Sequence, residues 1–304
     1  MTGPWGHEPV LCEEALTYWV TDPRGLYLDG TVGAGGHAEA LLHRFSEARV
    51  IGLDRDPAAL ETARARLGPF GSRAHLEHAD FAEMDNVLRR SGGALAGILL
   101  DLGISSLQLD DPDRGFSYLE NAPLKMTLDR DAPSGAREFL AAIEEGALAE
   151  LLRDYGELSR AGRIAREIVA ARNANRLDTT QDLVLALGRA GLSHPRHLSQ
   201  AFQALRFAVN GELESLDRGL SVAARVLPPS GRLVVIAFES LTDRRVKQTF
   251  RPVRTGRPHP GVPEPRPTWR VLTPKAIRPE PEETSRNPRA RSARLRAAER
   301  TSDA

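Results

Sequence analysis

Two hydrophobic patterns alternate along the first 110 residues of the chain. Short apolar runs predict buried β-strands at 26–30, 48–54, 74–80 and 94–101. Helical spacing of apolar residues separates the first three runs, and Asp56 followed by Pro57 supplies an N-cap and a first residue for the helix that continues to Leu67. Strands that alternate with helices in this way predict a doubly wound α/β sheet with helices on both faces.

This alternation stops after Asp101. The next strong strand pattern begins about 130 residues later, whereas a βαβ crossover needs roughly 30 residues. Most of the gap has helical spacing, in stretches at 137–156, 159–174 and 179–191. We therefore predict a mostly helical insertion over 111–203, inside a discontinuous domain that comprises 1–110 and 204–304.

The last third of the chain is expected to complete the sheet. Residues 202–227 read as one long helix that covers the sheet, and 231–238 as the fifth strand. The segment 251–281 is rich in proline and arginine, which predicts an extended surface segment with a possible strand at 268–273.

Charge is balanced overall but not along the chain. Lys+Arg and Asp+Glu number 41 each, yet 251–304 holds 13 basic and 6 acidic residues, a net charge of +7. Five of these basic residues are arginines between Arg289 and Arg300. Guanidinium groups suit phosphate contacts, so the tail predicts a polyanionic partner; a solvated basic tail is the alternative.

Several classes of protein are disfavoured. Cys12 is the single cysteine, so no intrachain disulfide can form. No apolar run has the length of a membrane span and no signal-peptide pattern is present, which predicts a cytoplasmic protein without a membrane partner. His194 and His197 have ligand-like spacing, but no cysteine or acidic residue completes a zinc pattern, so we predict no metal site.

A glycine-rich loop lies between the first strand and the first helix. Gly33, Gly35 and Gly36 allow positive φ angles and a close approach of the backbone to a ligand, and the following helix directs free N–H groups towards an anionic group. The spacing also satisfies a relaxed dinucleotide fingerprint, so a nicotinamide dehydrogenase is one alternative. A tight turn without a ligand is another. His37, inside the loop, is interpreted as a cofactor contact.

Two residues are candidates for holding an adenosyl group. Asp54 ends the second strand, 21 residues after Gly33, which is the place of an acid that binds ribose hydroxyls in NAD or S-adenosylmethionine. Its alternative role is to cap the turn that follows. Phe81, just after the third strand, can stack on adenine, although a single aromatic residue is more often part of the core.

Asp101 is the candidate reactive group. It ends an apolar strand at the carboxyl edge of the predicted sheet, where open α/β sheets bind their ligands. A carboxylate there can accept a hydrogen bond from an exocyclic amine and so favour a localised lone pair aimed at an electrophilic methyl group. The alternative is that Asp101 fixes its own loop through backbone N–H groups.

Taken together, these segments resemble the S-adenosylmethionine-dependent small-subunit ribosomal RNA cytosine-N4 methyltransferases, the MraW/RsmH family. The resemblance runs nearly end to end, and the block around LDLGISS-x-QLDD-x-x-RGFS is its most specific part. The matching segments are HEPVLCEEAL, LDGTVGAGGH, IGLDRDPAAL, GILLDLGISSLQLDDPDRGFSY, YGELSRAGRIAREIV, FQALRFAVNGELESL, GRLVVIAFESLTDRRVK and NPRARSARLRAAER.

The resemblance implies a Rossmann-like class I methyltransferase sheet with an inserted helical domain, S-adenosyl-L-methionine as the cofactor, and 16S ribosomal RNA of the small ribosomal subunit as the partner. It also implies methyl transfer to the exocyclic N4 of a cytidine, with Asp101 placed to engage the target amine. The implied cofactor contacts are Gly35, Gly36, His37, Asp54, Phe81, Asp101 and Gln108.

The chain departs from the family pattern in two places. PLKMTLD stands where the family has PLDMRMD, and FESLTDR where it has FHSLEDR, so Lys125, Thr127, Glu239 and Thr242 differ. These departures leave two further alternatives open: an amino-methyltransferase that acts on DNA or protein, and a non-catalytic RNA-binding factor of ribosome assembly.

Overall fold

The computed structural model describes residues 8–251 and 268–302. The chain folds into two compact units. The first unit combines Met1–Gly103 with Ser215–Ala304, and the second is Ile104–Glu214. The insertion predicted at 111–203 therefore lies within the second unit.

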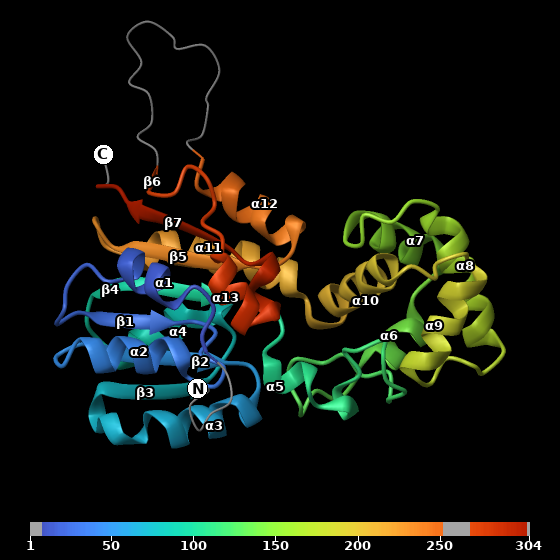
Figure 1. Ribbon diagram of the computed structural model, residues 1–304, viewed down its shortest axis with the longest axis horizontal. Coiled ribbons are helices and arrows are strands. Elements are labelled where there is room, and N and C mark those ends of the chain that lie inside the picture. Colours follow the sequence, from blue (N-terminus) through green and yellow to red (C-terminus); the bar gives the residue numbers. More distant parts are fainter. Residues whose placement is uncertain (1–7, 252–267, 303–304) are drawn as a thin grey trace, which may run out of the picture. The chain divides into compact units, whose positions relative to one another are not determined.

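The first unit is built on a sheet of seven strands in the order β3-β2-β1-β4-β5-β7-β6 (Figure 1). Neighbouring strands from β3 to β5 are parallel, whereas β7 is antiparallel to both of its neighbours. The strands are β1 (Leu26–Asp29), β2 (Arg49–Asp54), β3 (Ala74–His78), β4 (Leu95–Asp101), β5 (Arg232–Ala237), β6 (Trp269–Val271) and β7 (Arg294–Arg300). The doubly wound α/β prediction and the strand expected within 268–273 are confirmed.

Helices cover both faces of this sheet because its central strands are apolar on both sides. Val50 of β2 packs in the cluster that contains residues of α1, α2 and α3, while the next residue, Ile51, packs in the cluster that contains residues of α4, α11 and α12. The helices of this unit are α1 (Cys12–Trp19), α2 (Gly36–Arg44), α3 (Pro57–Leu67), α4 (Met84–Ser91), most of α11 (Glu212–Val226), α12 (Ser240–Thr249) and α13 (Pro281–Arg286), with 3-10 turns η1 (Gly68–Arg73), η2 (Phe81–Glu83) and η4 (Pro288–Ser292).

The basic C-terminal tail is a strand of the sheet, so the interpretation as a solvated tail is wrong. Leu295, Ala297 and Ala298 of β7 are fully buried, and β7 pairs with β5 along its length. Arg296 donates to both carboxylate oxygens of Asp243 on α12, at 2.6 and 3.1 Å. This ion pair compensates the charge of an arginine that is buried within the strand.

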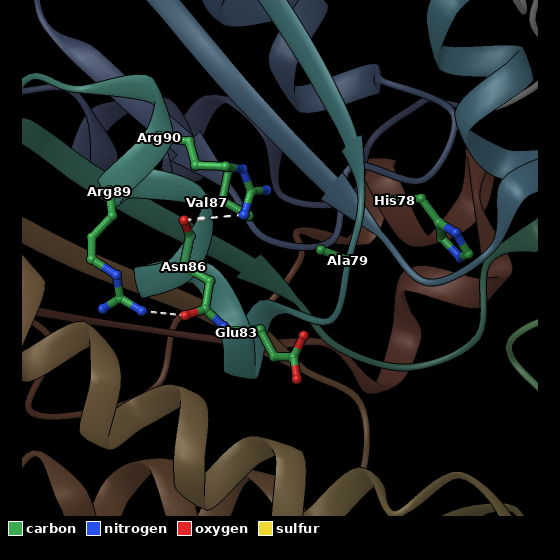
Figure 2. A pocket seen from close by; sticks show the side chains of 7 residues that line it. All are labelled: His78, Ala79, Glu83, Asn86, Val87, Arg89 and Arg90. Carbon is green, nitrogen blue, oxygen red and sulfur yellow. Dashed lines mark hydrogen bonds between the residues drawn. The ribbon is translucent and has the colours of Figure 1, made fainter.

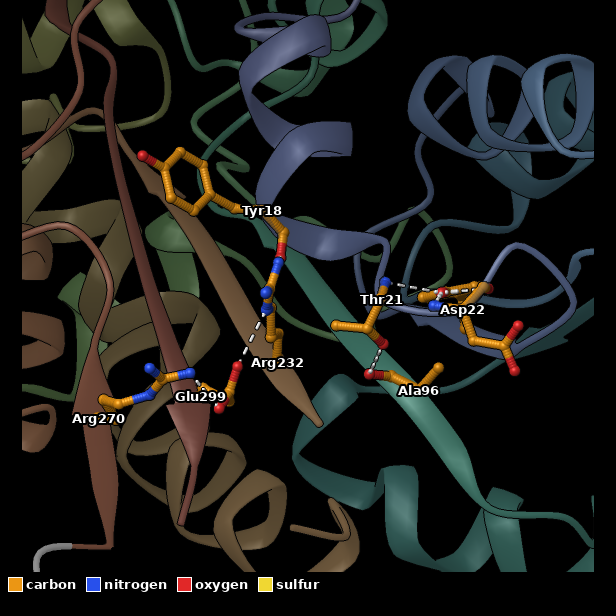
Figure 3. Close-up of polar contacts among 8 residues, drawn as sticks. Tyr18, Thr21, Asp22, Ala96, Arg232, Arg270 and Glu299 are labelled. Atoms are coloured by element: carbon orange, nitrogen blue, oxygen red, sulfur yellow. Dashed lines mark hydrogen bonds and ion pairs between the residues drawn. The ribbon is translucent and has the colours of Figure 1, made fainter. Parts of the chain in front are cut away.

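The opposite end of β7 is held by a second polar network, drawn in Figure 3. Glu299 of β7 accepts from Arg232 of β5 at 3.4 Å and from Arg270 of β6 at 2.5 Å. Arg232 also donates to the carbonyl of Tyr18 on α1, at 3.3 Å. One carboxylate thereby links three adjacent strands, whose order β5-β7-β6 is set by their backbone pairing.

The long helix predicted over 202–227 is in fact two helices. Gly211 adopts φ +58° and ends α10 (Pro195–Asn210) before α11 begins. A glycine in the left-handed conformation is a common helix terminus, because it adopts positive φ without steric cost. The helix after the glycine loop, α2, begins at Gly36, inside the loop sequence. Of the segment 251–281, residues 252–267 lie outside the described part of the chain.

The second unit is helical around its own apolar core, as the spacing predicts. Leu148, Ile164 and Leu183 come from three successive helices and are buried together in that core. Its elements are α5 (Ser106–Leu109), η3 (Pro112–Arg114), α6 (Ala136–Ala142), α7 (Glu145–Asp154), α8 (Ala161–Asn173), α9 (Thr180–Arg189), α10 and the first residues of α11. Over the described residues of both units, no helix has the length and hydropathy to cross a membrane.

Candidate functional site at the carboxyl edge of the sheet

Three carboxyl side chains end three adjacent parallel strands of the first unit. Asp54 ends β2, Asp29 ends β1 and Asp101 ends β4. Because β1 lies between β2 and β4 and all three strands run in the same direction, these residues line one edge of the sheet. This is the edge at which open α/β sheets bind their ligands.

The glycine loop joins β1 to α2 at this same edge. Gly33 and Gly35 have φ angles of +51° and +83°, which favour glycine, and Gly35 is the N-cap of α2. No side chain caps this helix start, so backbone N–H groups at the first turn of α2 are directed to the site. A Cβ on Gly36 would lie 3.2 Å from the Pro9 Cβ. The loop therefore combines positive φ angles with uncapped backbone N–H groups, which is the arrangement that binds an anionic group.

Asp54 is tied to the glycine loop and to its own turn. Its Oδ2 accepts from the Gly33 N–H at 2.8 Å, and its Oδ1 accepts from the Asp56 N–H at 2.9 Å. Burial raises the pKa of Asp54 to about 6, although these hydrogen bonds oppose the rise. The turn-capping interpretation is thus observed. It does not compete with ribose binding, because each carboxylate oxygen has a further lone pair.

Asp101 has a buried carboxylate oxygen without a hydrogen-bond partner. Its Oδ1 makes no hydrogen bond among the residues that the structure describes, and burial raises the pKa of the carboxyl group to about 7. The Asp101 N–H donates to the Thr31 hydroxyl at 2.6 Å, which holds the backbone but leaves the carboxylate unused. The alternative in which this carboxylate fixes its own loop is wrong. A buried acceptor left unpaired is costly, so it points to a donor on a ligand.

His37 presents a second acceptor to the same space. Its Nε2 lies 2.9 Å from the Val10 carbonyl oxygen, which can only accept, so Nε2 carries the proton and Nδ1 has a free lone pair. Burial lowers the pKa of His37 to about 4, which keeps the ring neutral. Nδ1 faces the Asp101 Oδ2 at 3.9 Å. Two acceptors at this separation are arranged to share an N–H donor.

Asp29 also belongs to this edge, at the end of β1, although it was not among the predicted site residues. Its side chain is 1% exposed, and burial, helped by the negative charges of Asp101 and Asp54, raises its pKa to about 8. The Thr31 N–H lies 3.3 Å from its Oδ1. The sequence signal that could have identified Asp29 as a site residue is its position at the end of an apolar strand, directly before the glycine loop. A protonated Asp29 lowers the negative charge beside Asp101 at neutral pH.

Phe81 is buried beside the loop. Its side chain packs in the sheet core, where a Cβ on Gly30 would lie 3.0 Å from the Phe81 Cβ and a Cβ on Gly219 would lie 2.5 Å from its ring. Phe81 is therefore a residue of the sheet core, as the alternative interpretation predicted. A role beside adenine stays a prediction.

Gln108 lies in the second unit and is used there as a capping residue. Its Oε1 accepts from the Ser105 N–H at 2.9 Å in a capping box at the start of α5. Its amide nitrogen also donates to the Leu128 carbonyl at 3.4 Å. The predicted contact of Gln108 with a cofactor rests on the resemblance and stays a prediction.

The four departures from the family pattern are divided between the units. Lys125 is exposed and Thr127 is buried, both in the second unit. In the first unit, Glu239 is the N-cap of α12 and Thr242 is buried in that helix. None of the four lies in the loop or on the three acidic strand ends.

A polar cavity of about 440 Å³ lies at the outer end of the same edge, where β3 ends and α4 begins. Figure 2 shows Asn86, Val87 and Arg90 on α4, with His78 and Ala79 on the β3 side. The Ala79 N–H donates to the Asp54 carbonyl at 3.0 Å. The cavity therefore borders the turn after β2, and the sequence patterns did not predict it.

The sheet order with an antiparallel β7 between β5 and β6, together with the glycine loop after β1 and the acid after β2, defines a class I methyltransferase. Residues 5–301 match the sequence model of the MraW methylase family, and the chain belongs to that family. It is therefore a methyltransferase, with S-adenosyl-L-methionine as the methyl donor. The dehydrogenase alternative is wrong.

Named relatives agree with this assignment over nearly their whole length. The chain is 44% identical to the ribosomal RNA small subunit methyltransferase H of Symbiobacterium thermophilum, over 96% of this chain and 95% of that protein. It is 43% identical to the protein of the same name from Methylorubrum populi, over 98% of this chain and 88% of that protein. The Mycolicibacterium smegmatis protein is also 43% identical, over 97% and 84%.

Proposed function

We propose that this chain transfers a methyl group from S-adenosyl-L-methionine to the exocyclic N4 of a cytidine in the 16S ribosomal RNA of the small ribosomal subunit. The names of its relatives support the choice of ribosomal RNA. The observation that carries the choice of an amine is Asp101, whose unpartnered, buried Oδ1 is an acceptor for an N–H group.

The residues of the carboxyl edge fit the methyl donor. Asp54 would accept from the ribose hydroxyls, and the uncapped start of α2 after Gly35 and Gly36 would bind the carboxylate of the methionyl part. Phe81 would lie beside adenine. When bound, the donor supplies an electrophilic methyl group on a sulfonium. The neutral His37 places no competing positive charge next to that sulfonium.

Asp101 would act on the acceptor nitrogen. The N4 lone pair of cytosine is delocalised into the ring, so the amine is a weak nucleophile until its N–H groups are held by an acceptor. The amine would form the new N–CH₃ bond with its lone pair while the bond from the methyl group to the sulfonium sulfur breaks, with S-adenosyl-L-homocysteine as the by-product, and it would then lose one proton. A carboxyl group with a pKa of about 7 is partly ionised at neutral pH and can accept that proton.

The second unit, with the predicted insertion 111–203, would bind the RNA substrate. The target base has to leave its stack to present N4, which favours a loop or a splayed nucleotide as the acceptor. Residues 1–110 and 204–304 would form the methyltransferase domain. Because the proposed substrate is the RNA of the small ribosomal subunit, the reaction is proposed to occur in the cytoplasm.

The acceptor is tested with labelled S-adenosyl-L-methionine and small ribosomal subunits from cells that lack this protein. We expect transfer to these subunits and none to subunits from cells that contain the protein, whose site is already filled. Large subunits and duplex DNA are matched acceptors that should stay unlabelled. Transfer to duplex DNA alone, or no transfer despite donor binding, would contradict the proposal.

A further inference from the structure

The peptide group that joins Val10 to Leu11 is held from two sides. Its N–H, on Leu11, donates to the Glu283 Oε1 at 2.8 Å, and its carbonyl oxygen, on Val10, lies 2.9 Å from the His37 Nε2. The N–H and the C=O of a trans peptide point in opposite directions, because the group is planar. One peptide group therefore links the Glu283 carboxylate to the His37 ring.

Glu283 reaches this peptide from the C-terminal part of the chain. It lies on α13, and the residues Ala290 and Ala293 that follow this helix are buried in the same apolar cluster as Val10 and Leu11. The Glu283 side chain is half-buried, so its bond to the Leu11 N–H is a charge-assisted hydrogen bond that is partly shielded from water. The packing of the C-terminal segment thus brings an anionic acceptor to the N-terminal segment.

The backbone at Leu11 shows that the orientation of this peptide is imposed by its surroundings. Leu11 has a φ of +52°, in the left-handed region that residues with a side chain rarely adopt. Rotating the Val10–Leu11 peptide by half a turn would return this φ to a negative value and would exchange the places of the N–H and the C=O. A strained backbone persists only where its neighbours determine it. Glu283 stabilises the observed orientation, because its carboxylate accepts from an N–H and cannot donate to a C=O.

The orientation of the peptide decides which nitrogen of His37 carries the proton. With the C=O facing the ring, Nε2 donates, and Nδ1 keeps the lone pair that faces the Asp101 Oδ2 at 3.9 Å. With the N–H facing the ring, Nε2 would have to accept, and the proton of the neutral ring would move to Nδ1. The ring would then present a donor where it now presents an acceptor. The carboxylate also polarises the amide, which strengthens its C=O as an acceptor for Nε2.

We propose that Glu283 is a positioning residue for the methyl donor, which holds His37 as the Nε2–H tautomer through the Val10–Leu11 peptide. The inference deepens the proposed function and rests on one part of it, the contact of His37 with S-adenosyl-L-methionine. The ammonium group of the methionyl part has N–H donors and no lone pair, so it requires acceptors such as the His37 Nδ1. The other tautomer would turn an N–H towards that ammonium group.

The test reads the tautomer of His37 in the donor-free protein. Wild type is compared with Glu283→Ala and Glu283→Gln, and Glu282→Ala is the matched control, because Glu282 is the exposed preceding residue of α13 with the same charge. The ¹⁵N–¹H correlations of the imidazole ring identify the protonated nitrogen, and the His37 signals are assigned by their loss in His37→Gln. We expect the Nε2–H tautomer in wild type, in Glu282→Ala and in Glu283→Gln, whose amide oxygen can still accept from the Leu11 N–H. In Glu283→Ala the proton should move to Nδ1.

Calorimetric titration then measures the affinity for S-adenosyl-L-methionine, at a temperature well below the melting transition of each variant. Glu283→Ala should bind the donor about tenfold more weakly, whereas Glu283→Gln and Glu282→Ala should stay close to wild type. Glu283→Asp withdraws the carboxylate by one methylene and carries the same expectation as Glu283→Ala. It decides the question if the alanine variant does not fold.

The tautomer separates this role from a structural one. A lower melting temperature of Glu283→Ala with an unchanged His37 tautomer would overturn the inference, because a merely structural hydrogen bond predicts that result. A changed tautomer with unchanged donor affinity would overturn the role in donor binding and, with it, the proposed contact of His37. Neither measurement involves RNA, so a failure of methyl transfer to small subunits would contradict the proposed acceptor and not this inference.

Discussion

Asp101→Asn removes one buried charge with almost no change in shape, and it should make the protein more stable. In the folded chain, burial raises the pKa of this carboxyl group from 3.8 to about 7. The folded state therefore holds a proton that the unfolded chain releases at lower pH. An asparagine has no such proton to lose, so the variant escapes the cost of a buried carboxylate.

The magnitude follows from the two pKa values. Well below the unfolded pKa of 3.8 the carboxyl group is protonated in both states and contributes nothing. Between about pH 4 and pH 7 the free energy of unfolding of the wild type falls by about 1.4 kcal/mol per pH unit, because only the unfolded chain is ionised. Above pH 7 both states are ionised, and the loss levels off at about 4 kcal/mol. The stability difference between variant and wild type should follow this curve.

Urea denaturation of both proteins at several values between about pH 5 and pH 8 measures that difference. We expect the variant to be the more stable protein at pH 8, with a gap that widens by roughly 2 to 3 kcal/mol over this interval. Asp154→Asn, which removes the same charge at an exposed site on α7, is the control. A gap at Asp101 that is independent of pH, or a variant that is less stable at pH 8, would refute the reasoning.

Three further predictions concern the donor site and the anchor of β7. Asp54→Asn should weaken S-adenosyl-L-methionine binding by about tenfold or more in calorimetric titration, since a charged acceptor is lost, and should leave the KM for small subunits unchanged. Gly35→Ala should destabilise the fold by about 1 to 2 kcal/mol and reduce donor affinity, because φ is +83° and the new Cβ would lie 3.3 Å from the Leu67 side chain; equal melting temperatures would contradict this. Asp243→Ala should cost about 3 to 5 kcal/mol in denaturant unfolding by leaving Arg296 buried and unpaired, whereas Asp243→Ala with Arg296→Met should recover much of that loss.

The parallel part of the sheet was predictable because its signal is local. β4 and β5 are continuous apolar runs, and burial on both faces is what such runs encode. β7 was not predictable in the same way, because its arginines predicted a polyanionic partner, with a solvated tail as the alternative, and not a strand. The residue that neutralises Arg296 is Asp243, 53 positions away, and no local pattern reveals a partner at that distance.

The candidate site, like the sheet, was only partly predictable from the sequence. The glycine loop and the acids after β2 and β4 are recognisable from their positions at strand ends, and Asp54 and Asp101 do end those strands. What the sequence cannot supply is the burial of Asp29, the tautomer of His37 or the lack of a partner at Asp101 Oδ1. Each of these depends on which neighbours fill the surrounding space. They are also the features that shift the pKa values on which the proposed chemistry depends.

The central claim is that the methyl group goes to an exocyclic amine of cytidine. The most direct test digests small-subunit RNA to nucleosides after the reaction and identifies the labelled nucleoside by mass spectrometry. We predict N4-methylcytidine with wild-type protein and its loss by about 100-fold or more with Asp101→Asn, when donor binding is retained. A label on a ring carbon, on a ribose or on another base would contradict it.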